Sequence, residues 1–545
     1  GHLSLASGLE KRGRTFDAAQ AYQRALDLDP ACMVARFNLG AALRVLLRLP
    51  DAEACFRQVI AQQPELAAAH SNLGHTLLAQ GRLALAEQSF RTALALQPDY
   101  AAAANNLAVV LKEQGQMSAA VASCQHALAL APDWAAAYSN LLFFMSHDVL
   151  VDAQELRLAH LAFGQRYEAP LRAQWPQHRN TPEPDRRLNV GFVSGDLCDH
   201  AVAGFLEPVL KALSLKPGLR LHAYYSHGAQ DAVTQRVQAL FAHWTHVGML
   251  DDAALAQRIA QDSIDILIDL SGHTAHNRLL AFARKPAPVQ ATWLGYPGST
   301  GLCAMDYFIC DRAWVPPGEL DWQLSEKPAY LRVTALHPGS ANAPAVSPLP
   351  ALERGYVTLG SFNRANKINA SVVALWSMLL QALPTARLAL AGMSGDSEAL
   401  LRPQFEAQGI APERLSFFRR TNLNDYLALH QGVDLCLDTY PYSGGTTTCH
   451  AAWMGVPTLC LAGETLASRS SAAEMMHLGL DAFVAHSVED FVALGQHWAS
   501  HLDELATIRQ SLRARFEASP MGQVQAFADN FEALLRAMWQ RWCAG

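Results

Sequence analysis

The sequence lacks several features that mark common classes of protein. Its 10 cysteines include no C-x-x-C pair and no cysteine–histidine cluster at zinc spacing, so we expect reduced core thiols and no metal site. The net charge of −7 argues against a broad basic surface for nucleic acid. No uninterrupted apolar run is long enough to span a bilayer, and no signal-peptide pattern is visible. These absences predict a cytoplasmic protein with neither nucleic acid nor membrane as a partner.

The first 140 residues instead carry a repeat of fixed period. Prolines and asparagines each recur every 34 residues, and small residues occupy the positions where helices would pack closely. This pattern is typical of antiparallel helix pairs stacked into a superhelix, the tetratricopeptide architecture. The phased residues are Pro30, Pro64, Pro98 and Pro132, with Asn38, Asn72, Asn106 and Asn140 in the segments FNLG, SNLG, NNLA and SNLL.

The four repeat asparagines allow two interpretations. They share one phase of the first helices, so they are expected to line the concave surface of the array. An amide ladder there could hold the backbone of an extended acceptor peptide through paired donors and acceptors. The alternative is that each asparagine packs the turn of its own repeat, and the array serves as a protein-binding scaffold.

The chain after the repeats predicts a change from helices to alternating strands and helices. Helical periodicity continues over 141–187, and the proline-rich segment 181–185 then marks a boundary. Short apolar strands separated by helices follow, interrupted by an irregular segment at 336–352. The predicted strands are 188–193, 221–225, 264–268, 289–293 and 307–310 before that segment, and 357–362, 386–391, 415–418, 433–437 and 458–461 after it. We therefore predict an α + α/β protein with repeats at 1–140, a helical linker at 141–187, and Rossmann-like lobes at 188–345 and 346–545.

The segment Asp438–Ser471 contains the strongest binding signal in the second lobe. A buried strand at 433–437 precedes the run SGGTTT, which opens a helix. Unpaired backbone N–H groups at a helix start, next to glycines, can bind phosphate. The same turn also caps ordinary helices, so both readings stay open. Three polar loops that follow predicted strands, at 194–200, 294–301 and 363–368, are expected to face the cleft between the lobes.

The repeats together with GFVSGDLCDH, WLGYPGSTG, FNRANKI, CLDTYPYSGGTTT and GETLASRSS resemble the O-linked N-acetylglucosamine transferases. The resemblance implies a GT-B catalytic part that transfers N-acetylglucosamine from UDP-GlcNAc to Ser or Thr hydroxyls of proteins with inversion. It also implies that no cofactor or metal is used. The only D-x-D motif, Asp27-Leu28-Asp29, lies in a repeat helix, where it cannot serve a nucleotide-sugar metal site.

The resemblance also assigns candidate site residues. It places His200 near the sugar and acceptor, as a general base or a binding residue, and Lys367 at the diphosphate as a catalytic cation. The remaining candidates for nucleotide-sugar binding are Leu294, Gly295, Pro297, Arg364, Thr421, Gly444, Gly445, Thr446, Thr447 and His450.

Three positions depart from the family pattern. Gly445 stands where animal members have His, His450 where relatives have Asp, and Leu423 where a Lys is expected beside the uracil. These departures keep two other functions open. One is a protein O-fucosyltransferase that uses GDP-fucose, like the plant SPINDLY proteins, and the other is a repeat scaffold whose transfer site has decayed.

Overall fold

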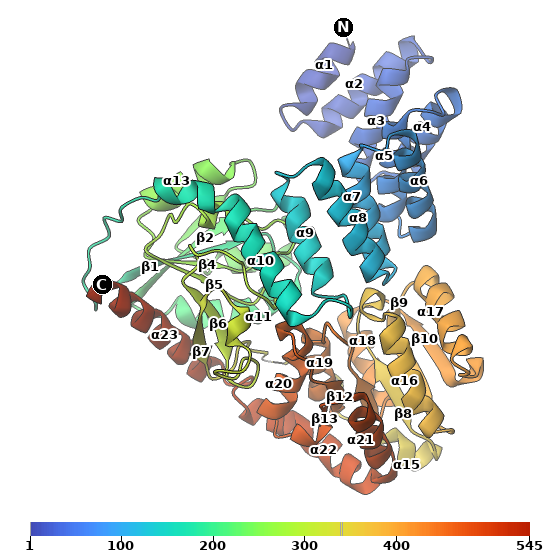
Figure 1. The fold of residues 1–545 in the computed structure, drawn as a ribbon, viewed down its shortest axis with the longest axis vertical. Coiled ribbons are helices and arrows are strands. Elements are labelled where there is room, and N and C mark those ends of the chain that lie inside the picture. The colour runs from blue at the N-terminus through green and yellow to red at the C-terminus, as the bar shows by residue number, and fades with distance from the viewer. Residues whose placement is uncertain (1, 338, 341) are drawn as a thin grey trace. The chain divides into compact units, whose positions relative to one another are not determined.

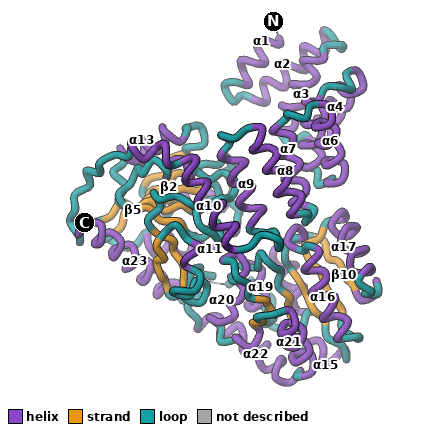
Figure 2. Tube along the Cα trace, in the orientation of Figure 1, coloured by secondary structure: helices purple, strands orange, loops and turns teal. Residues whose placement is uncertain are grey.

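The computed structural model describes residues 2–337, 339–340 and 342–545. Its chain divides into two compact units, which are considered separately. The first contains the residues up to Phe144, with the short segment Gly395–Leu400, and the second contains the rest. Figure 1 shows helices alone in the first unit and strands flanked by helices in the second, and Figure 2 separates the two kinds of element by colour.

The first unit consists of antiparallel helix pairs, as the 34-residue repeat predicts. In the two middle pairs, the aromatic ring of the second helix packs where the preceding helix has a glycine: a Cβ at Gly40 would lie 2.9 Å from Phe56, and one at Gly74 would lie 2.9 Å from Phe90. The helices are α1 (His2–Glu10), α2 (Thr15–Leu28), α3 (Met33–Val45), α4 (Leu49–Gln62), α5 (Ala67–Ala79), α6 (Leu83–Leu96), α7 (Ala101–Glu113), α8 (Met117–Leu130) and α9 (Ala135–Met145).

The turn within each helix pair repeats a left-handed backbone conformation. Gly13, Gly81 and Gly115 have φ of 71°, 76° and 75°, and Leu47 occupies the same phase with φ of 58°. Glycine adopts this conformation without steric cost, whereas Leu47 does so with strain. The turns therefore follow the same 34-residue period as the prolines.

A short helical segment leads from the repeats into the first α/β lobe. It consists of α10 (Ala153–Tyr167) and the 3₁₀ helix η1 (Ala169–Gln174), and Asp152 caps α10 by accepting a hydrogen bond from Glu155 N. The loop between α9 and α10 begins with three buried residues, Ser146, His147 and Asp148, each at most 5% exposed.

The first lobe is a parallel sheet of seven strands in the order β3-β2-β1-β4-β5-β6-β7. Its strands are β1 (Leu188–Ser194), β2 (Leu219–Tyr225), β3 (His243–His246), β4 (Ile266–Asp269), β5 (Val289–Thr292), β6 (Tyr307–Asp311) and β7 (Lys327–Leu331). Its helices are α11 (Ala201–Leu213), α12 (Ala232–Gln238), α13 (Asp252–Gln261), α14 (Leu279–Phe282) and η2 (Asp321–Gln323).

The second lobe is a parallel sheet of six strands in the order β10-β9-β8-β11-β12-β13. Its strands are β8 (Thr358–Ser361), β9 (Arg387–Met393), β10 (Leu415–Arg419), β11 (Leu435–Leu437), β12 (Thr458–Leu461) and β13 (Val484–Ala485). The order in each sheet reverses beside its first strand, which is the place where parallel α/β sheets bind ligands.

The helices of the second lobe cover its sheet and then return to the first lobe. The last helix, α23, packs against α11 and β7, and its Phe531 ring lies 4.6 Å from the ring of Trp293. The remaining elements are α15 (Pro350–Arg354), η3 (Ala365–Lys367), α16 (Ala370–Ala382), α17 (Gly395–Ala407), η4 (Pro412–Arg414), α18 (Leu423–Leu429), η5 (His430–Gly432), α19 (Thr446–Trp453), η6 (Leu466–Ser468), α20 (Ser470–His477), η7 (Asp481–Phe483), α21 (Val488–Ser500), α22 (Leu502–Ala518) and α23 (Val524–Ala544).

Candidate active site

The glycine-rich loop between β11 and α19 leaves backbone donors unused. Gly444 N donates to the Asp438 carboxylate at 2.7 Å, which fixes the loop. Within the described part of the chain, the N–H groups of Gly445 and Thr446–Thr448 have no hydrogen-bond partner. They lie in the first turn of a helix, where the helix dipole favours an anion. This geometry suits a phosphate group, so the predicted anion cradle has the donors that it needs.

Lys367 faces this loop from the neighbouring strand. It ends η3, just after β8, and its Nζ donates to Ser443 O at 2.8 Å. Burial lowers the pKa of Lys367 to about 8, although the nearby Asp438 carboxylate acts to raise it. Thr447 Oγ1 donates to Asn363 Oδ1 at 3.2 Å, which joins the same two segments a second time. The structure therefore brings a full cation beside the free amides of α19.

The ring of Tyr442 links Lys367 to the start of the second compact unit. Lys367 Nζ lies 4.7 Å from the centroid of Tyr442, over its ring. The imidazole of His147 stacks on Tyr442 with centroids 3.7 Å apart and planes 14° apart. Because a ring at 3.7 Å leaves no room on that face, the ammonium lies over the opposite face. This arrangement was not predicted, since it joins residues almost 300 positions apart in the sequence.

Arg364 and the predicted nucleotide-base residues lie at the edge of the site. Arg364 is exposed, and its charge lowers the pKa of Lys367. Thr421 is also exposed, and its hydroxyl contacts Asp425 Oδ2 at 3.3 Å. Leu423, at the position where the family pattern has a lysine, is 51% exposed. The geometry of these three side chains does not by itself indicate a ligand contact.

His450 belongs to a cluster of rings that sequence reasoning did not find. It lies on α19, with ring centroids 5.1 Å from His337 and 5.5 Å from Tyr426. Burial lowers the pKa of His450 to about 4, so the ring is neutral at pH 7. A neutral imidazole can donate or accept one hydrogen bond, whereas an aspartate at this place would only accept.

His200 caps a helix in the first lobe. It is the N-cap of α11, and its Nδ1 accepts a hydrogen bond from Val202 N at 3.3 Å. Asp196 Oδ2 lies 3.8 Å from the same Nδ1, and the His200 side chain is 41% exposed. When Nδ1 accepts, the proton of the neutral ring is on Nε2, which then acts as a donor. In this arrangement His200 is suited to bind an oxygen rather than to take a proton.

The loop after β5 is held in a conformation that depends on its glycine. Leu294 has φ of 68°, and a Cβ at Gly295 would lie 2.0 Å from Leu270 O, which no side chain could occupy. Tyr296 is buried, with its hydroxyl 3.0 Å from His160 Nε2. Pro297 follows, half-buried. The loop is therefore rigid and presents Leu294, Gly295 and Pro297 at the carboxyl end of β5.

Among the described contacts between the two lobes, three involve the segment GETLAS or the helix that follows it. Trp314 Nε1 donates to Leu466 O at 2.8 Å, and Gln323 Nε2 donates to Glu464 O at 2.7 Å. His477 Nε2 lies 3.2 Å from the Asp311 carboxylate. The segment GETLAS is thus anchored on the first lobe. None of the described hydrogen bonds or ion pairs joins His200 to the second lobe, so the structure groups Lys367 with α19 but leaves His200 separate.

The repeat asparagines lie one on each of α3, α5, α7 and α9, and all four are half-buried. Asn72 Nδ2 donates to Ala68 O at 2.9 Å, and Asn106 Nδ2 lies 2.7 Å from His75 Nε2. Asn140 Nδ2 donates to Asn105 Oδ1 at 3.1 Å. The amides therefore make contacts within the array while part of each stays accessible, and the peptide-clamp interpretation stays a prediction.

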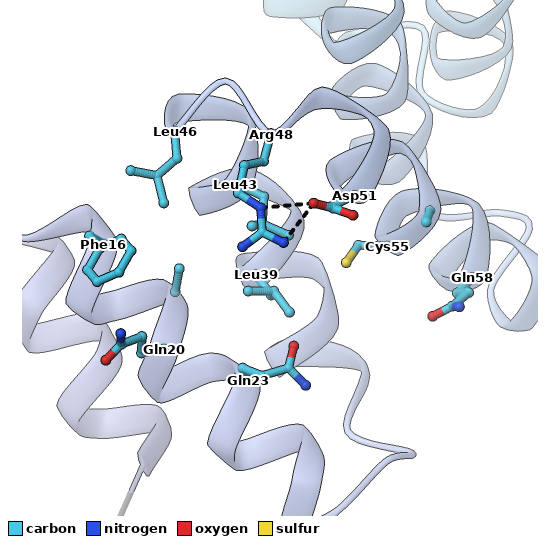
Figure 3. A pocket seen from close by; sticks show the side chains of 12 residues that line it. Phe16, Gln20, Gln23, Leu39, Leu43, Leu46, Arg48, Asp51, Cys55 and Gln58 are labelled. Carbon is cyan, nitrogen blue, oxygen red and sulfur yellow. Dashed lines mark hydrogen bonds and ion pairs between the residues drawn. The ribbon is translucent and has the colours of Figure 1, made fainter.

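The repeat array also contains a pocket of about 350 Å³ between α2, α3 and α4 (Figure 3). Leu39 and Leu43 lie at its base, and an ion pair of 2.7 Å joins Arg48 and Asp51 at its rim. Burial raises the pKa of the Cys55 thiol, which keeps it unreactive. The lining offers binding surface without a reactive group, so the candidate chemistry lies in the α/β unit.

Two absences hold for the residues that the structure describes. No helix there is long and apolar enough to cross a membrane. No group of three or more His, Cys, Asp or Glu side chains in the same residues is arranged to hold a metal ion.

Comparisons with known proteins agree with this architecture. The family model for glycosyl transferase family 41 matches residues 135–339 and 351–531, and a tetratricopeptide repeat model matches 3–67, 46–94 and 71–134. A mutant O-GlcNAc transferase of Thermobaculum terrenum has a solved structure that is 34% identical. Its TM-score is 0.87, and the match covers 95% of this chain and 99% of that one.

Curated relatives carry the names of peptide N-acetylglucosaminyltransferases. A probable UDP-N-acetylglucosamine–peptide N-acetylglucosaminyltransferase SPINDLY of Solanum lycopersicum is 34% identical over 396 residues, covering 71% of this chain and 42% of the relative. The UDP-N-acetylglucosamine–peptide N-acetylglucosaminyltransferase of Caenorhabditis elegans is 24% identical over 483 residues, covering 66% and 41%. The chain thus spans less than half the length of these relatives. Its two-lobed fold and the match over both lobes show that the chain belongs to glycosyl transferase family 41.

Proposed function

We propose that this chain transfers N-acetylglucosamine from UDP-GlcNAc to Ser or Thr hydroxyls of proteins in the cytoplasm. The observation that carries the proposal is the placement of Lys367 beside the unused amides of α19, with its Nζ 2.8 Å from Ser443 O. A nucleotide diphosphate is the ligand that needs both a cation and a helix start. The names of the relatives favour UDP-GlcNAc over GDP-fucose as the donor.

The reaction would proceed by one displacement with inversion. The acceptor oxygen forms a bond to the anomeric carbon while the bond to the β-phosphate of UDP breaks, and the hydroxyl proton leaves to a base or to water. Negative charge then grows on the departing phosphate. Lys367 and the N–H groups of α19 would stabilise it without a metal, by electrostatic catalysis from preorganised groups.

The remaining site residues would bind the donor and the acceptor. Thr446 and Thr447 offer hydroxyls at the phosphate loop, and His450 offers a neutral ring beside it. The rigid loop at Leu294, Gly295 and Pro297 would contact the sugar, with His200 donating from Nε2 nearby. Arg364 and Thr421 would lie at the nucleotide, and the asparagines of the array would hold the acceptor protein.

Calorimetric titration with UDP and GDP side by side tests the proposed donor. We expect UDP to bind with micromolar or better affinity in the presence of a metal chelator, and GDP to give no signal. Binding of GDP alone would support a GDP-sugar donor instead. The absence of a binding signal for both nucleotides would support a scaffold with a decayed site.

A further inference from the structure

Glu474 is a half-buried residue whose carboxyl group lies beside the phosphate loop. It lies on α20, and its Oε2 atom is inaccessible to solvent and has no hydrogen-bond partner among the described residues. None of the described ion pairs includes it. An ionised carboxylate with a buried, unpaired oxygen is costly, so this atom favours the neutral form of the carboxyl.

The position of Gly445 connects this carboxyl to the loop. A Cβ built at Gly445 would lie 3.9 Å from Glu474 Oε1, and it would meet no other atom within 4 Å beyond its chain neighbours. The glycine thus leaves Oε1 without a covering side chain at the N-cap of α19, next to the unused amides, while Oε2 is the buried oxygen. A phosphate held by those amides would lie within reach of Glu474.

The surroundings of Glu474 favour its neutral form. Burial raises the pKa of Glu474 well above its ordinary value, and the carboxylates of Asp438 and Asp311 raise it further. A hydrogen bond with Cys449 and the charge of Lys367 act to lower the pKa, and each has a smaller effect than burial. His477, on the same helix, lies against Asp311. A protonated carboxyl has an O–H donor, whereas a carboxylate can only accept.

We propose that Glu474 stays protonated and donates a hydrogen bond to a diphosphate oxygen of the nucleotide sugar at the N-terminus of α19. The proposal rests on the proposed function for the identity of the donor, and it adds a residue to the phosphate site. The O–H of Glu474 would complement Lys367, because it supplies a donor without adding charge. As the sugar–phosphate bond breaks and charge grows on the β-phosphate, this hydrogen bond strengthens while the proton stays on Glu474.

Two substitutions of similar length separate donation from charge. Glu474→Gln keeps a neutral donor at this place, whereas Glu474→Met keeps the length and removes the donor. Glu489→Gln on α21 is a matched control, because Glu489 is exposed and lies outside the site. Each protein is titrated calorimetrically at pH 7 with UDP, GDP and inorganic pyrophosphate, and its melting temperature is recorded. Glu474→Ala replaces the Met variant if that variant does not fold.

We expect Glu474→Gln and Glu489→Gln to bind UDP within threefold of the unchanged protein. Glu474→Met should bind it about tenfold more weakly. Tighter binding by Glu474→Gln would show that the native group is ionised and would overturn the proposal. Equal binding by all variants would show that Glu474 does not contact the phosphate. If GDP binds in place of UDP, the proposed donor is wrong, yet the ratio between the Gln and Met variants still tests Glu474. If none of the three ligands binds, the loop is not a phosphate site and the proposal falls.

Discussion

Lys367 is expected to carry the largest electrostatic share of the transfer. Its ammonium is the full cation placed at the α19 amides, whereas the helix start contributes only about half a unit charge. Two opposite unit charges about 4 Å apart attract by roughly 4 kcal/mol at an effective dielectric constant of about 20. The loss of one preorganised contact to a developing charge costs about 100- to 1000-fold in rate, or roughly 3–4 kcal/mol. The Coulomb energy and the cost of a lost contact agree, so Lys367→Met should lower the rate of transfer by about 100- to 1000-fold.

The pH dependence of the reaction gives an independent measurement of the same residue. Because burial holds the pKa of Lys367 near 8, the free enzyme loses this charge as the pH rises through about 8. The kcat/KM for the donor reports the free enzyme and should fall over this range. A bound diphosphate favours the charged form, so the fall in kcat should come at higher pH. Lys367→Arg keeps its charge and should show no fall near pH 8, although its planar group fits the site less well.

The assay is initial-rate transfer to an acceptor protein between pH 6 and 10, with melting temperature as the control for folding. The reasoning is refuted if Lys367→Met keeps more than about a tenth of the native turnover, a loss under roughly 1.4 kcal/mol. The reasoning is also refuted if the fall in kcat/KM near pH 8 persists in Lys367→Arg, since another group would then be titrating.

Three further predictions concern the other parts of the site. His200→Ala should lose a helix cap worth roughly 1 kcal/mol of stability, and His200→Asn should restore it. Because Nε2 donates, both variants should keep any fall in kcat/KM at acid pH. If that fall disappears when the ring is removed, His200 is the base. Tyr442→Phe should keep the native kcat, whereas Tyr442→Leu should lower kcat several-fold with little change in donor KM. The Leu variant lacks the ring that contacts the Lys367 ammonium and stacks on His147. Equal kcat in both variants would show that the ring stack does not contribute to the transfer. Replacing Asn72 and Asn106 by Ala should weaken transfer to a folded acceptor protein while UDP affinity and melting temperature stay native. Unchanged transfer would contradict the peptide-clamp interpretation.

Local patterns predicted most of the fold. The repeat helices could be located because each period places the same small residues and prolines at the same phase, and the buried strands could be located because parallel sheets bury both faces. The strands β3, β7 and β13 were missed. Strands β3 and β7 lie at sheet edges, where partial exposure permits polar residues such as the histidines of β3 and the Lys-Pro that opens β7. Strand β13 is buried but only two residues long, too short to give an apolar run.

The site was predictable only where one segment carries it. The sequence around Gly444 and Thr446 places glycines and hydroxyls at one helix start, and Lys367 follows a strand that neighbours that helix. The stack of His147 on Tyr442 joins distant segments, so no local pattern could indicate it. Glu474 was missed because a single acidic residue on a short helix usually faces solvent, and only the packing of α20 shows that its Oε2 atom is buried.

The most direct test of the account is intact-mass analysis of an acceptor protein after incubation with the enzyme, a metal chelator and an equimolar mixture of UDP-GlcNAc and GDP-fucose. We predict addition of N-acetylhexosamine to Ser or Thr residues, with release of UDP, and loss of this product with Lys367→Met. Addition of deoxyhexose, or an acceptor left unmodified by the native enzyme but modified when divalent metal is restored, would contradict the account.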